Sequence, residues 1–243
     1  MEIDVYKFYD ANHENHWWFE GKKNIMLSIL KKNINKNNLK ILDFGCGVGV
    51  NTKMLSDFGH VTCYDESPEA IKYLKKKFNN DEKISIVNNF ENCNELFDLI
   101  IASDVLEHIE NDERELKKIH KLLKPNGLFL ATVPAYQFLF SKKDIEVQHK
   151  RRYNILNFNN LISPFFHKIK LSYYNFFLFL PIVLAIFYYK IFKINFTNNV
   201  NAKPNKLFNY LLYKIFIFEK LFLNKITFPF GVSLIFMGRK KSG

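Results

Sequence analysis

Three glycines that follow a short apolar segment place the strongest constraint on the fold of this chain. Gly45, Gly47 and Gly49 come directly after residues 40–44, which are typical of a buried strand, and a helix is predicted over residues 51–58. Glycine lets the backbone turn tightly and lets a ligand lie close to the main chain. The third glycine follows the second by two residues rather than three, so the loop differs from the dinucleotide-binding fingerprint. The segment predicts a ligand site of another kind.

Two acidic residues indicate what that ligand is. Asp43 lies two residues before the first glycine, where a carboxylate would repel a pyrophosphate but would suit a cation. Asp65 ends the next predicted strand, where an acidic side chain can hold ribose hydroxyls. A nucleoside that carries a positive charge and no phosphate fits both residues, and S-adenosylmethionine has that chemistry.

Strands and helices alternate along most of the chain, which favours a parallel, doubly wound α/β sheet. Ser67 is a plausible N-cap for a helix that begins at Pro68. Strands are predicted at residues 40–44, 60–65, 84–87, 97–102, 128–133, 168–174 and 231–237, and further helices at 21–36, 51–58, 112–123 and 155–166. We therefore expect an N-terminal lid and first helix (1–37), a ligand-binding core (38–174), an apolar, basic helical insert (175–230), and a last strand with a basic tail (231–243).

Four segments resemble the class I S-adenosylmethionine-dependent methyltransferases. They are LDFGCGVG (42–49), VTCYDESPEA (61–70), FDLIIASDVLEHI (97–109) and LLKPNGLFLATVP (122–134), in the order and spacing of that family. The resemblance implies a Rossmann-like sheet and S-adenosylmethionine as cofactor. It also implies a set of cofactor-binding residues: Asp43, Gly45, Cys46 and Gly47 for the methionine part, Asp65 and Glu66 for the ribose, Asn89 and Phe90 beside the adenine, and Ser103 and Asp104 on the sulfonium side. The position of Asn89 is often Asp in that family.

Two further stretches resemble a bacterial subgroup associated with cell-surface glycan or lipid-linked biosynthesis. These are HWWF (16–19) and the segment from VPAYQ (133–137) to HKRRY (149–153), and the likeness extends to PFGVS (229–233). An oxygen or nitrogen acceptor of a methyl group can need a base near neutral pH, and histidine is the usual one. His149 follows the fifth predicted strand, on the edge where ligands bind in open α/β sheets. We therefore expect His149 to act as base or to orient the acceptor, with Asp144 beside it.

The same resemblance implies a group of substrate or lid residues, which are Trp17, Trp18, His108, Tyr136, Arg151 and Arg152. The tryptophans are expected in a lid that excludes water, the alternative being a helix permanently docked on the sheet. The two arginines could instead form a structural cluster with Tyr153. His108 is expected to pack near the sulfonium pocket. This region helps to hold a divalent metal in some related quinone methyltransferases, but we expect no metal here.

The second part of the chain is basic, aromatic and apolar. Residues 151–243 hold 14 lysines and arginines, one acid and 16 of the 26 phenylalanines, although the whole chain carries only +11. Residues 171–189 contain no charge, but their first part is assigned to a strand and the chain must return to the sheet. We therefore expect an interfacial or re-entrant element at an anionic membrane surface rather than a span. The alternatives are a substrate cover or a dimer interface.

A second helix is predicted over residues 206–225 of this insert. Glu219 falls on its apolar side, where a lone carboxylate needs a partner or will take up a proton. Three environments are open for it: pairing with an arginine of residues 151–152, facing the acceptor pocket, or exposure at a rim.

Composition excludes several classes of protein. With 48% apolar and 24% charged residues the chain is too hydrophobic to be disordered, and a mean hydropathy of −0.15 excludes a polytopic membrane protein. The three cysteines lack metal-site spacing and the N-terminus lacks a signal-peptide pattern, so we expect a cytoplasmic protein, peripheral on the inner face of the membrane. We expect no nucleic-acid partner, because the positive charge lies with an apolar insert and Ser103-Asp104-Val105-Leu106 stands where nucleic-acid methyltransferases carry their tetrad.

We therefore expect a methyltransferase that acts on an oxygen or nitrogen of an amphipathic or glycan-type acceptor. Two alternatives stay open. One is a methyltransferase for soluble small molecules whose insert is only a lid. The other is a non-catalytic, cofactor-binding interaction protein. The sequence does not determine the oligomeric state.

Overall fold

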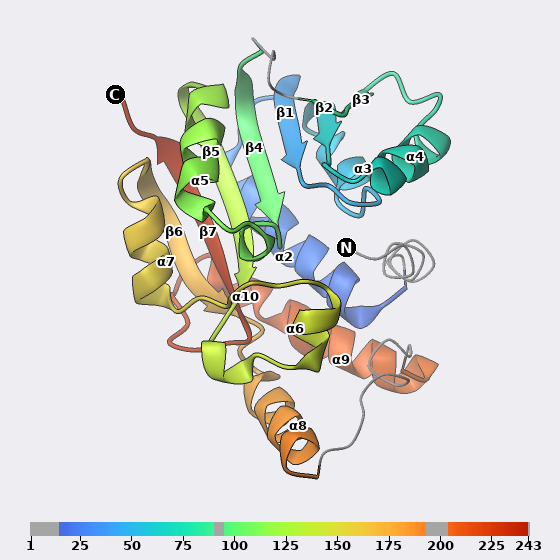
Figure 1. Cartoon of the computed structure of the whole chain (residues 1–243), viewed down its shortest axis with the longest axis vertical. Coiled ribbons are helices and arrows are strands. Elements are labelled where there is room, and N and C mark those ends of the chain that lie inside the picture. The colour runs from blue at the N-terminus through green and yellow to red at the C-terminus, as the bar shows by residue number, and fades with distance from the viewer. Residues whose placement is uncertain (1–14, 90–94, 193–203, 243) are drawn as a thin grey trace.

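A seven-stranded sheet forms the centre of the computed structural model, which describes residues 15–89, 95–192 and 204–242 (Figure 1). The strand order is β3-β2-β1-β4-β5-β7-β6. The strands are β1 (Leu39–Phe44), β2 (Gly59–Tyr64), β3 (Ile84–Val87), β4 (Phe97–Ser103), β5 (Leu123–Pro134), β6 (Phe166–Tyr174) and β7 (Ser233–Lys240). The first five are joined by parallel pairing, whereas β7 runs antiparallel to both β5 and β6. The doubly wound sheet is confirmed, and the antiparallel β7 makes it a mixed sheet.

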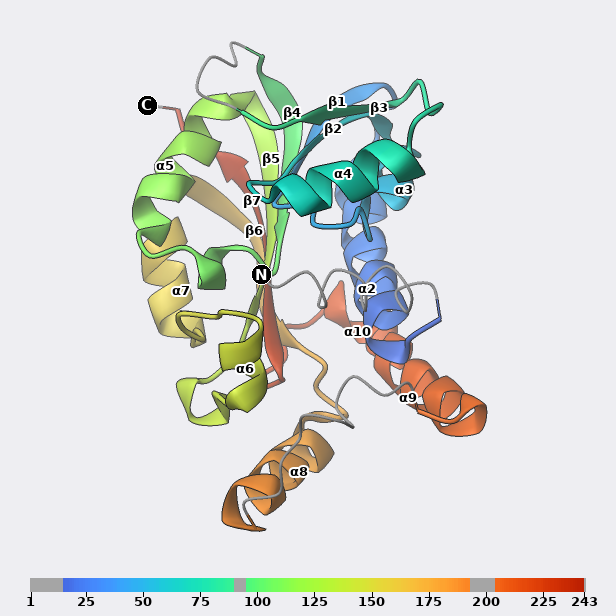
Figure 2. The same ribbon diagram turned by 45° about the vertical axis from the view of Figure 1, so that its right-hand side comes forward.

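Helices cover both faces of this sheet. Figure 2 shows α5 and α7 on one side and α2, followed by α9 and α10, on the other. The helices are α2 (Trp17–Asn33), α3 (Thr52–Leu55), α4 (Pro68–Lys77), α5 (Asp112–Leu122), α6 (Lys142–Glu146), α7 (Ile155–Ile162), α8 (Phe179–Phe192), α9 (Lys206–Phe218) and α10 (Lys220–Leu223), with short 3-10 turns η1 (Leu106–His108) and η2 (Gln137–Leu139). The predicted order of elements in the core is confirmed.

Local sequence signals explain where several elements begin. The Ser67 side chain accepts a hydrogen bond from Ala70 N and Pro68 opens α4, as the sequence predicts. Strand β4 is buried on both faces, since Leu99 to Ala102 are fully inaccessible to solvent. Helix α2 begins at Trp17, earlier than the predicted residue 21, because the His16 side chain accepts a hydrogen bond from Trp18 N and caps the helix.

The described part of the insert between β6 and β7, residues 175–192 and 204–230, contains α8, α9 and α10, of which α9 and α10 pack along α2. Trp17 N donates a hydrogen bond to Asn209 Oδ1 at 3.0 Å. Gly21 of α2 lies directly under the Phe216 ring, where a Cβ atom would come within 2.2 Å of it. The single helix predicted over residues 206–225 is present as two helices, α9 and α10, which meet at Glu219. No helix in the described ranges is both long enough and apolar enough to cross a membrane.

Glu219 lies in none of the three environments that the sequence left open. Its side chain is fully buried, and its carboxylate accepts hydrogen bonds from Asn175 N at 2.7 Å and Phe177 N at 3.0 Å. Burial raises the pKa of Glu219 to about 7, against the effect of these backbone N–H groups. The carboxylate thus ties the junction of α9 and α10 to the segment that joins β6 to α8, where the chain leaves the sheet.

We expect Glu219→Ala to lower the free energy of unfolding by about 3 kcal/mol, because two buried N–H groups lose their acceptor. Glu219→Gln keeps one oxygen acceptor and should lose about half as much. Urea denaturation followed by circular dichroism measures both changes. Glu66→Ala, at an exposed position, is the control and should stay within about 0.5 kcal/mol of the parent. Equal stability of the Glu219→Ala variant and the parent would contradict this role.

Candidate active site

The glycine loop joins β1 to α3 at the carboxyl edge of the sheet. Gly45, Gly47 and Gly49 all have positive φ, at 69°, 55° and 75°. A Cβ atom on Gly45 would come within 2.7 Å of the Val105 side chain, which follows β4. Glycine is therefore needed here both for the backbone conformation and for the close approach of the two strand ends.

The two acidic residues predicted from the sequence flank this loop. Asp43 is buried and its Oδ2 accepts a hydrogen bond from Thr52 Oγ1 at 2.8 Å. Burial raises the pKa of Asp43 to about 6. Asp65 accepts hydrogen bonds from the backbone N–H groups of Gly47 at 2.8 Å and Ser67 at 3.0 Å, and burial raises its pKa as well. Asp65 therefore joins the loop to the end of β2.

Asp104 is held by a lysine and a threonine from two other elements. It accepts hydrogen bonds from Lys22 Nζ at 2.6 Å and Thr132 Oγ1 at 2.7 Å. Burial raises the pKa of Asp104, but the ammonium group of Lys22 and the hydrogen bonds outweigh burial and bring this pKa below its usual range. Ser103 lies beside it, with its hydroxyl 3.2 Å from Thr132 Oγ1.

Lys22 is a site residue that the sequence analysis missed. It is only 6% exposed and projects from α2, so it connects the N-terminal helix to the end of β4. A signal was present in the sequence: Lys22 shares the helical spacing of Ile25, Met26 and Ile29, which form the buried face of α2.

The remaining predicted cofactor residues have varied environments. Gly45, Cys46 and Gly47 are half-buried in the loop, whereas Glu66 and Asn89 are exposed. Phe90 lies outside the described residues.

The glycine loop and its acids fit S-adenosylmethionine. A buried carboxyl group whose pKa is raised to about 6 becomes more favourably ionised when a cation lies beside it, as the sulfonium or ammonium of that cofactor would. Asp65 lies at the end of β2, where an acid can contact ribose hydroxyls.

His149 and Asp144 form a hydrogen-bonded pair, as the sequence predicts. His149 Nδ1 lies 2.8 Å from Asp144 Oδ1, and Asp144 is buried. Arg152 donates to both oxygens of this carboxylate, from Nε at 2.8 Å and from a terminal nitrogen at 3.0 Å. Burial raises the pKa of Asp144, but the hydrogen bonds from His149 and Arg152 hold it well below its usual range. An ionised Asp144 favours the proton on Nδ1 and leaves the Nε2 lone pair of His149 available.

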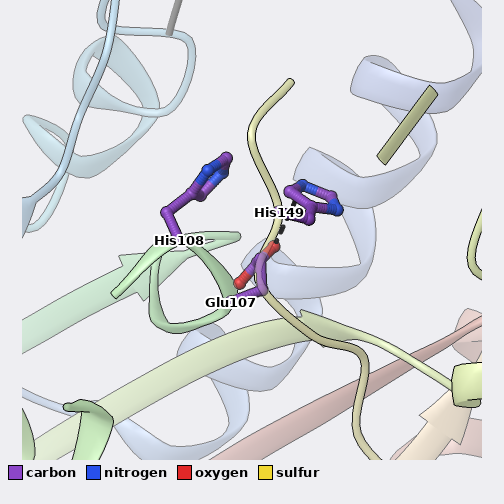
Figure 3. A group of neighbouring side chains, drawn as sticks. All are labelled: Glu107, His108 and His149. Carbon is purple, nitrogen blue, oxygen red and sulfur yellow. Dashed lines mark ion pairs between the residues drawn. The ribbon is translucent and has the colours of Figure 1, made fainter. Parts of the chain in front are cut away.

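Glu107 and His108 come close to the same imidazole (Figure 3). His149 Nε2 is 3.9 Å from Glu107 Oε1, and the His108 and His149 rings meet edge to face with centroids 4.6 Å apart. Glu107 is fully buried, and neither of its carboxyl oxygens has a hydrogen-bond partner among the residues that the structure describes. Burial, followed by the nearby charge of Asp104, raises the pKa of Glu107 well above its usual value. Burial and His149 lower the pKa of His108 to about 4, so this ring is neutral at pH 7.

This cluster also has the composition of a metal site. One ligand atom from each of Glu107, His108 and His149 lies within 4.8 Å of the other two, so these groups could share one metal ion. The absence of a metal, expected from the sequence, stays a prediction.

The predicted substrate and lid residues have largely structural contacts. Arg151 donates to Asp112 Oδ2 at 3.2 Å and to the Glu110 carbonyl at 2.8 Å. These contacts are of the kind expected for the structural cluster, and a role of Arg151 toward the substrate stays a prediction. Tyr136 stacks on Tyr173 with ring centroids 5.0 Å apart. Trp17 and Trp18 are half-buried in the first turn of α2, and both contact Phe216 of α9. In this structure α2 is docked through these contacts, and the lid role of the tryptophans stays a prediction.

Comparison with known proteins assigns the family. A family model described as a methyltransferase domain matches residues 16–170, which is more than half of the chain. The chain belongs to this methyltransferase family. The resemblance to class I methyltransferases found in the four motifs is therefore confirmed, while membership of the bacterial glycan- and lipid-linked subgroup stays a prediction.

Several individual proteins resemble this methyltransferase over part of their length. The mitochondrial ubiquinone biosynthesis O-methyltransferase of Rattus norvegicus is 35% identical over 115 residues, which cover 43% of this chain and 33% of that protein. The thiol S-methyltransferase TMT1A of Homo sapiens is 30% identical over 99 residues, which cover 37% of this chain and 41% of that protein. The chain thus spans less than half the length of these curated relatives.

Solved structures of methyltransferases share the fold. Phosphoethanolamine N-methyltransferase 2 of Haemonchus contortus, in complex with S-adenosyl-L-methionine, aligns with a TM-score of 0.59 and 17% identity over 90% of this chain and 52% of that chain. The N-methyltransferase NodS of Bradyrhizobium japonicum, in complex with S-adenosyl-L-homocysteine, gives a TM-score of 0.50 and 19% identity over 63% of this chain and 76% of that chain. At this level of identity the likeness shows the fold.

The affinity of the methyltransferase for S-adenosylmethionine should fall as the pH drops through 6. Only the ionised form of Asp43 attracts a cation, and its pKa in the free protein is about 6. Between pH 7 and pH 5 we expect a loss of about ten-fold, which isothermal titration calorimetry measures directly. Asp43→Asn is the control and should bind more weakly at pH 7 with a flatter pH dependence. A parent protein with the same affinity at both pH values would contradict this assignment.

The buried Glu107 carboxyl should make the folded protein less stable as the pH rises. Its pKa is higher in the folded state than in the unfolded state, so the folded state retains a proton that the unfolded state releases. Stability from this group is present below about pH 4.5 and declines above it. Glu107→Gln lacks this titration, so its stability relative to the parent should increase as the pH rises above about 5. Urea denaturation with a chelator present tests this, and parallel pH profiles of the two proteins would refute it.

Proposed function

We propose that this chain is an S-adenosylmethionine-dependent methyltransferase that methylates an oxygen or nitrogen acceptor, with His149 as the base. The observation that carries the proposal is the hydrogen bond between His149 Nδ1 and the buried Asp144 carboxylate, because it leaves Nε2 able to accept a proton. The pair follows β5 on the carboxyl edge of the sheet, the same edge that carries the glycine loop.

The roles of the chain's own groups follow from their contacts. Bound S-adenosylmethionine supplies a methyl group that is already activated by its sulfonium. The protein therefore has mainly to align donor and acceptor and to remove a proton from the acceptor. His149 Nε2 takes up that proton, Asp144 stabilises the imidazolium that results, and Arg152 fixes Asp144 through two hydrogen bonds. Asp43 and Asp104 supply negative charge near the cationic cofactor.

An amphipathic acceptor is supported by the composition of the insert and by the names of relatives. The rat relative is named for ubiquinone biosynthesis, and a protein of Clavispora lusitaniae that is 32% identical over 133 residues is named a sterol 24-C-methyltransferase. The alternatives are a small-molecule methyltransferase whose insert covers the acceptor and a cofactor-binding protein without catalysis. Labelled S-adenosylmethionine added to lipid, glycan and small-molecule extracts distinguishes the three by the fraction that gains one methyl mass.

His149→Ala should lower turnover by about 100- to 10,000-fold, the usual contribution of a general base. The affinity for S-adenosylmethionine should change little, because the Asp43 and Asp65 contacts remain. Turnover is measured as label transfer to the responsive extract, and affinity by calorimetry.

His167→Ala, at an exposed position on β6, is the matched control and should keep full turnover. Loss of cofactor binding in a folded His149→Ala protein would argue against the base. A parent protein that binds the cofactor but labels no extract would favour the non-catalytic alternative.

A further inference from the structure

Helix α8 is apolar on every side and yet largely exposed. Leu180, Leu184, Phe187 and Ile191 follow a helical spacing along it and are 62%, 61%, 42% and 71% exposed. A helix that is apolar all round is normally buried in a protein core or in lipid. At 14 residues α8 is about 21 Å long, short of the ~30 Å of a bilayer core. A helix of this kind is suited to lying in a membrane interface.

Helix α9 adds a second exposed apolar row, one that contains a positive charge. Its opposite face packs on α2, whereas Leu207 and Leu211 are 79% and 51% exposed. Lys214 continues this row at helical spacing and is also exposed, as is Lys206 at the start of the helix. Apolar side chains and lysines on one helix surface are typical of helices that bind anionic lipid.

The charge of the insert favours an anionic partner. Residues 175–230 contain seven lysines and a single acid, Glu219, and that acid is fully buried. The described insert therefore presents no carboxylate to solvent while it exposes several lysines. Charge complementarity points to a surface of negative headgroups, each lysine near such a surface strengthening binding by about five-fold.

The exposed apolar residues continue from α8 to the η2–α6 loop, which carries Asp144. The Phe187 ring contacts Phe138 of η2 with centroids 6.4 Å apart, and Lys190 Nζ donates to the Phe138 carbonyl at 2.8 Å. Phe138 is 50% exposed, and Ile145, next in sequence to Asp144, is 65% exposed. Figures 1 and 2 both place α6, α8 and α9 at the end of the molecule toward which β1 and β4 point.

We infer that α8, the outer face of α9 and the η2–α6 loop together form a docking surface for an anionic lipid bilayer. The His149–Asp144 pair adjoins this surface, so an amphipathic acceptor can reach the site from the bilayer with its polar part first. This inference deepens the proposed function by naming the source of the acceptor. Docking itself involves neither cofactor nor acceptor, so it is measured separately from methyl transfer.

Flotation of the full chain with lipid vesicles tests the inference. The protein should float with vesicles of phosphatidylcholine and phosphatidylglycerol at about three to one, and far less with phosphatidylcholine alone. Replacing Lys190 of α8 and Lys206 and Lys214 of α9, all exposed, with glutamine should weaken this partitioning on the order of 100-fold. The matched control replaces Lys72, Lys75 and Lys76, exposed lysines of α4, with glutamine and should leave partitioning unchanged.

A second pair of variants tests the apolar contribution. Leu184→Asp combined with Ile191→Asp should abolish flotation, whereas Leu156→Asp should not. Leu156 on α7 has the same 71% exposure as Ile191 and is outside the docking surface. Unchanged calorimetric binding of S-adenosylmethionine in every variant verifies that the site is intact.

Three results would overturn the inference. They are a parent protein that stays out of the anionic vesicle fraction, equal flotation with both vesicle types, and a loss in the control variants as large as in the test variants. If light scattering shows a dimer that the α8 variant dissociates, and no flotation occurs, the surface binds a second copy of the chain instead. Vesicle binding together with a failure to bind S-adenosylmethionine would refute the proposed function while leaving the docking surface in place.

Discussion

Buried and half-buried carboxyl groups gather at the edge where the parallel strands end, and the way in which each is compensated determines much of the site. An ionised carboxylate removed from water needs a hydrogen-bond donor or a positive charge, or else it binds a proton. Asp104 has Lys22 and Thr132, and Asp144 has His149 and Arg152, so both keep a low pKa. Within the described part of the chain, Asp43 has only the Thr52 hydroxyl as a side-chain donor and Glu107 has no hydrogen-bond partner for its carboxyl oxygens. Burial therefore raises the pKa of both groups.

These differences divide the groups by role. The paired carboxylates hold neighbouring parts of the chain in place: Asp104 connects α2 to β4, and Asp144 orients the His149 ring. The under-compensated groups, Asp43 and Glu107, are the ones whose charge state would respond most to a bound cation. Burial thus separates the groups that hold the site together from those that can respond to a ligand.

The insert follows the same physical rule in a different setting. Glu219 is buried, but it accepts two backbone hydrogen bonds at the point where β6 leads into α8. That contact helps to fix α9 and α10 along α2, with α9 turning its other face outward. Several apolar residues of α8 are exposed in the described structure, and an exposed apolar patch of this kind is uncommon on a soluble protein surface.

The sequence by itself determined the elements of the core, the glycine loop and the acids at the ends of β1 and β2. Such features depend on local patterns, because apolar runs, glycines and capping residues act over a few positions and parallel strands bring their carboxyl ends to one edge. His149 and Asp144 are only five residues apart, so their proximity could also be predicted from the sequence.

Only the tertiary structure decided the partners of the buried groups, since they come from distant segments: Lys22 and Asp104 are 82 residues apart, and Trp17 and Asn209 are 192 apart. It also decided the antiparallel direction of β7 and the contact of Trp17 and Trp18 with Phe216. Burial and pairing depend on which distant segments meet, and local sequence patterns do not encode that.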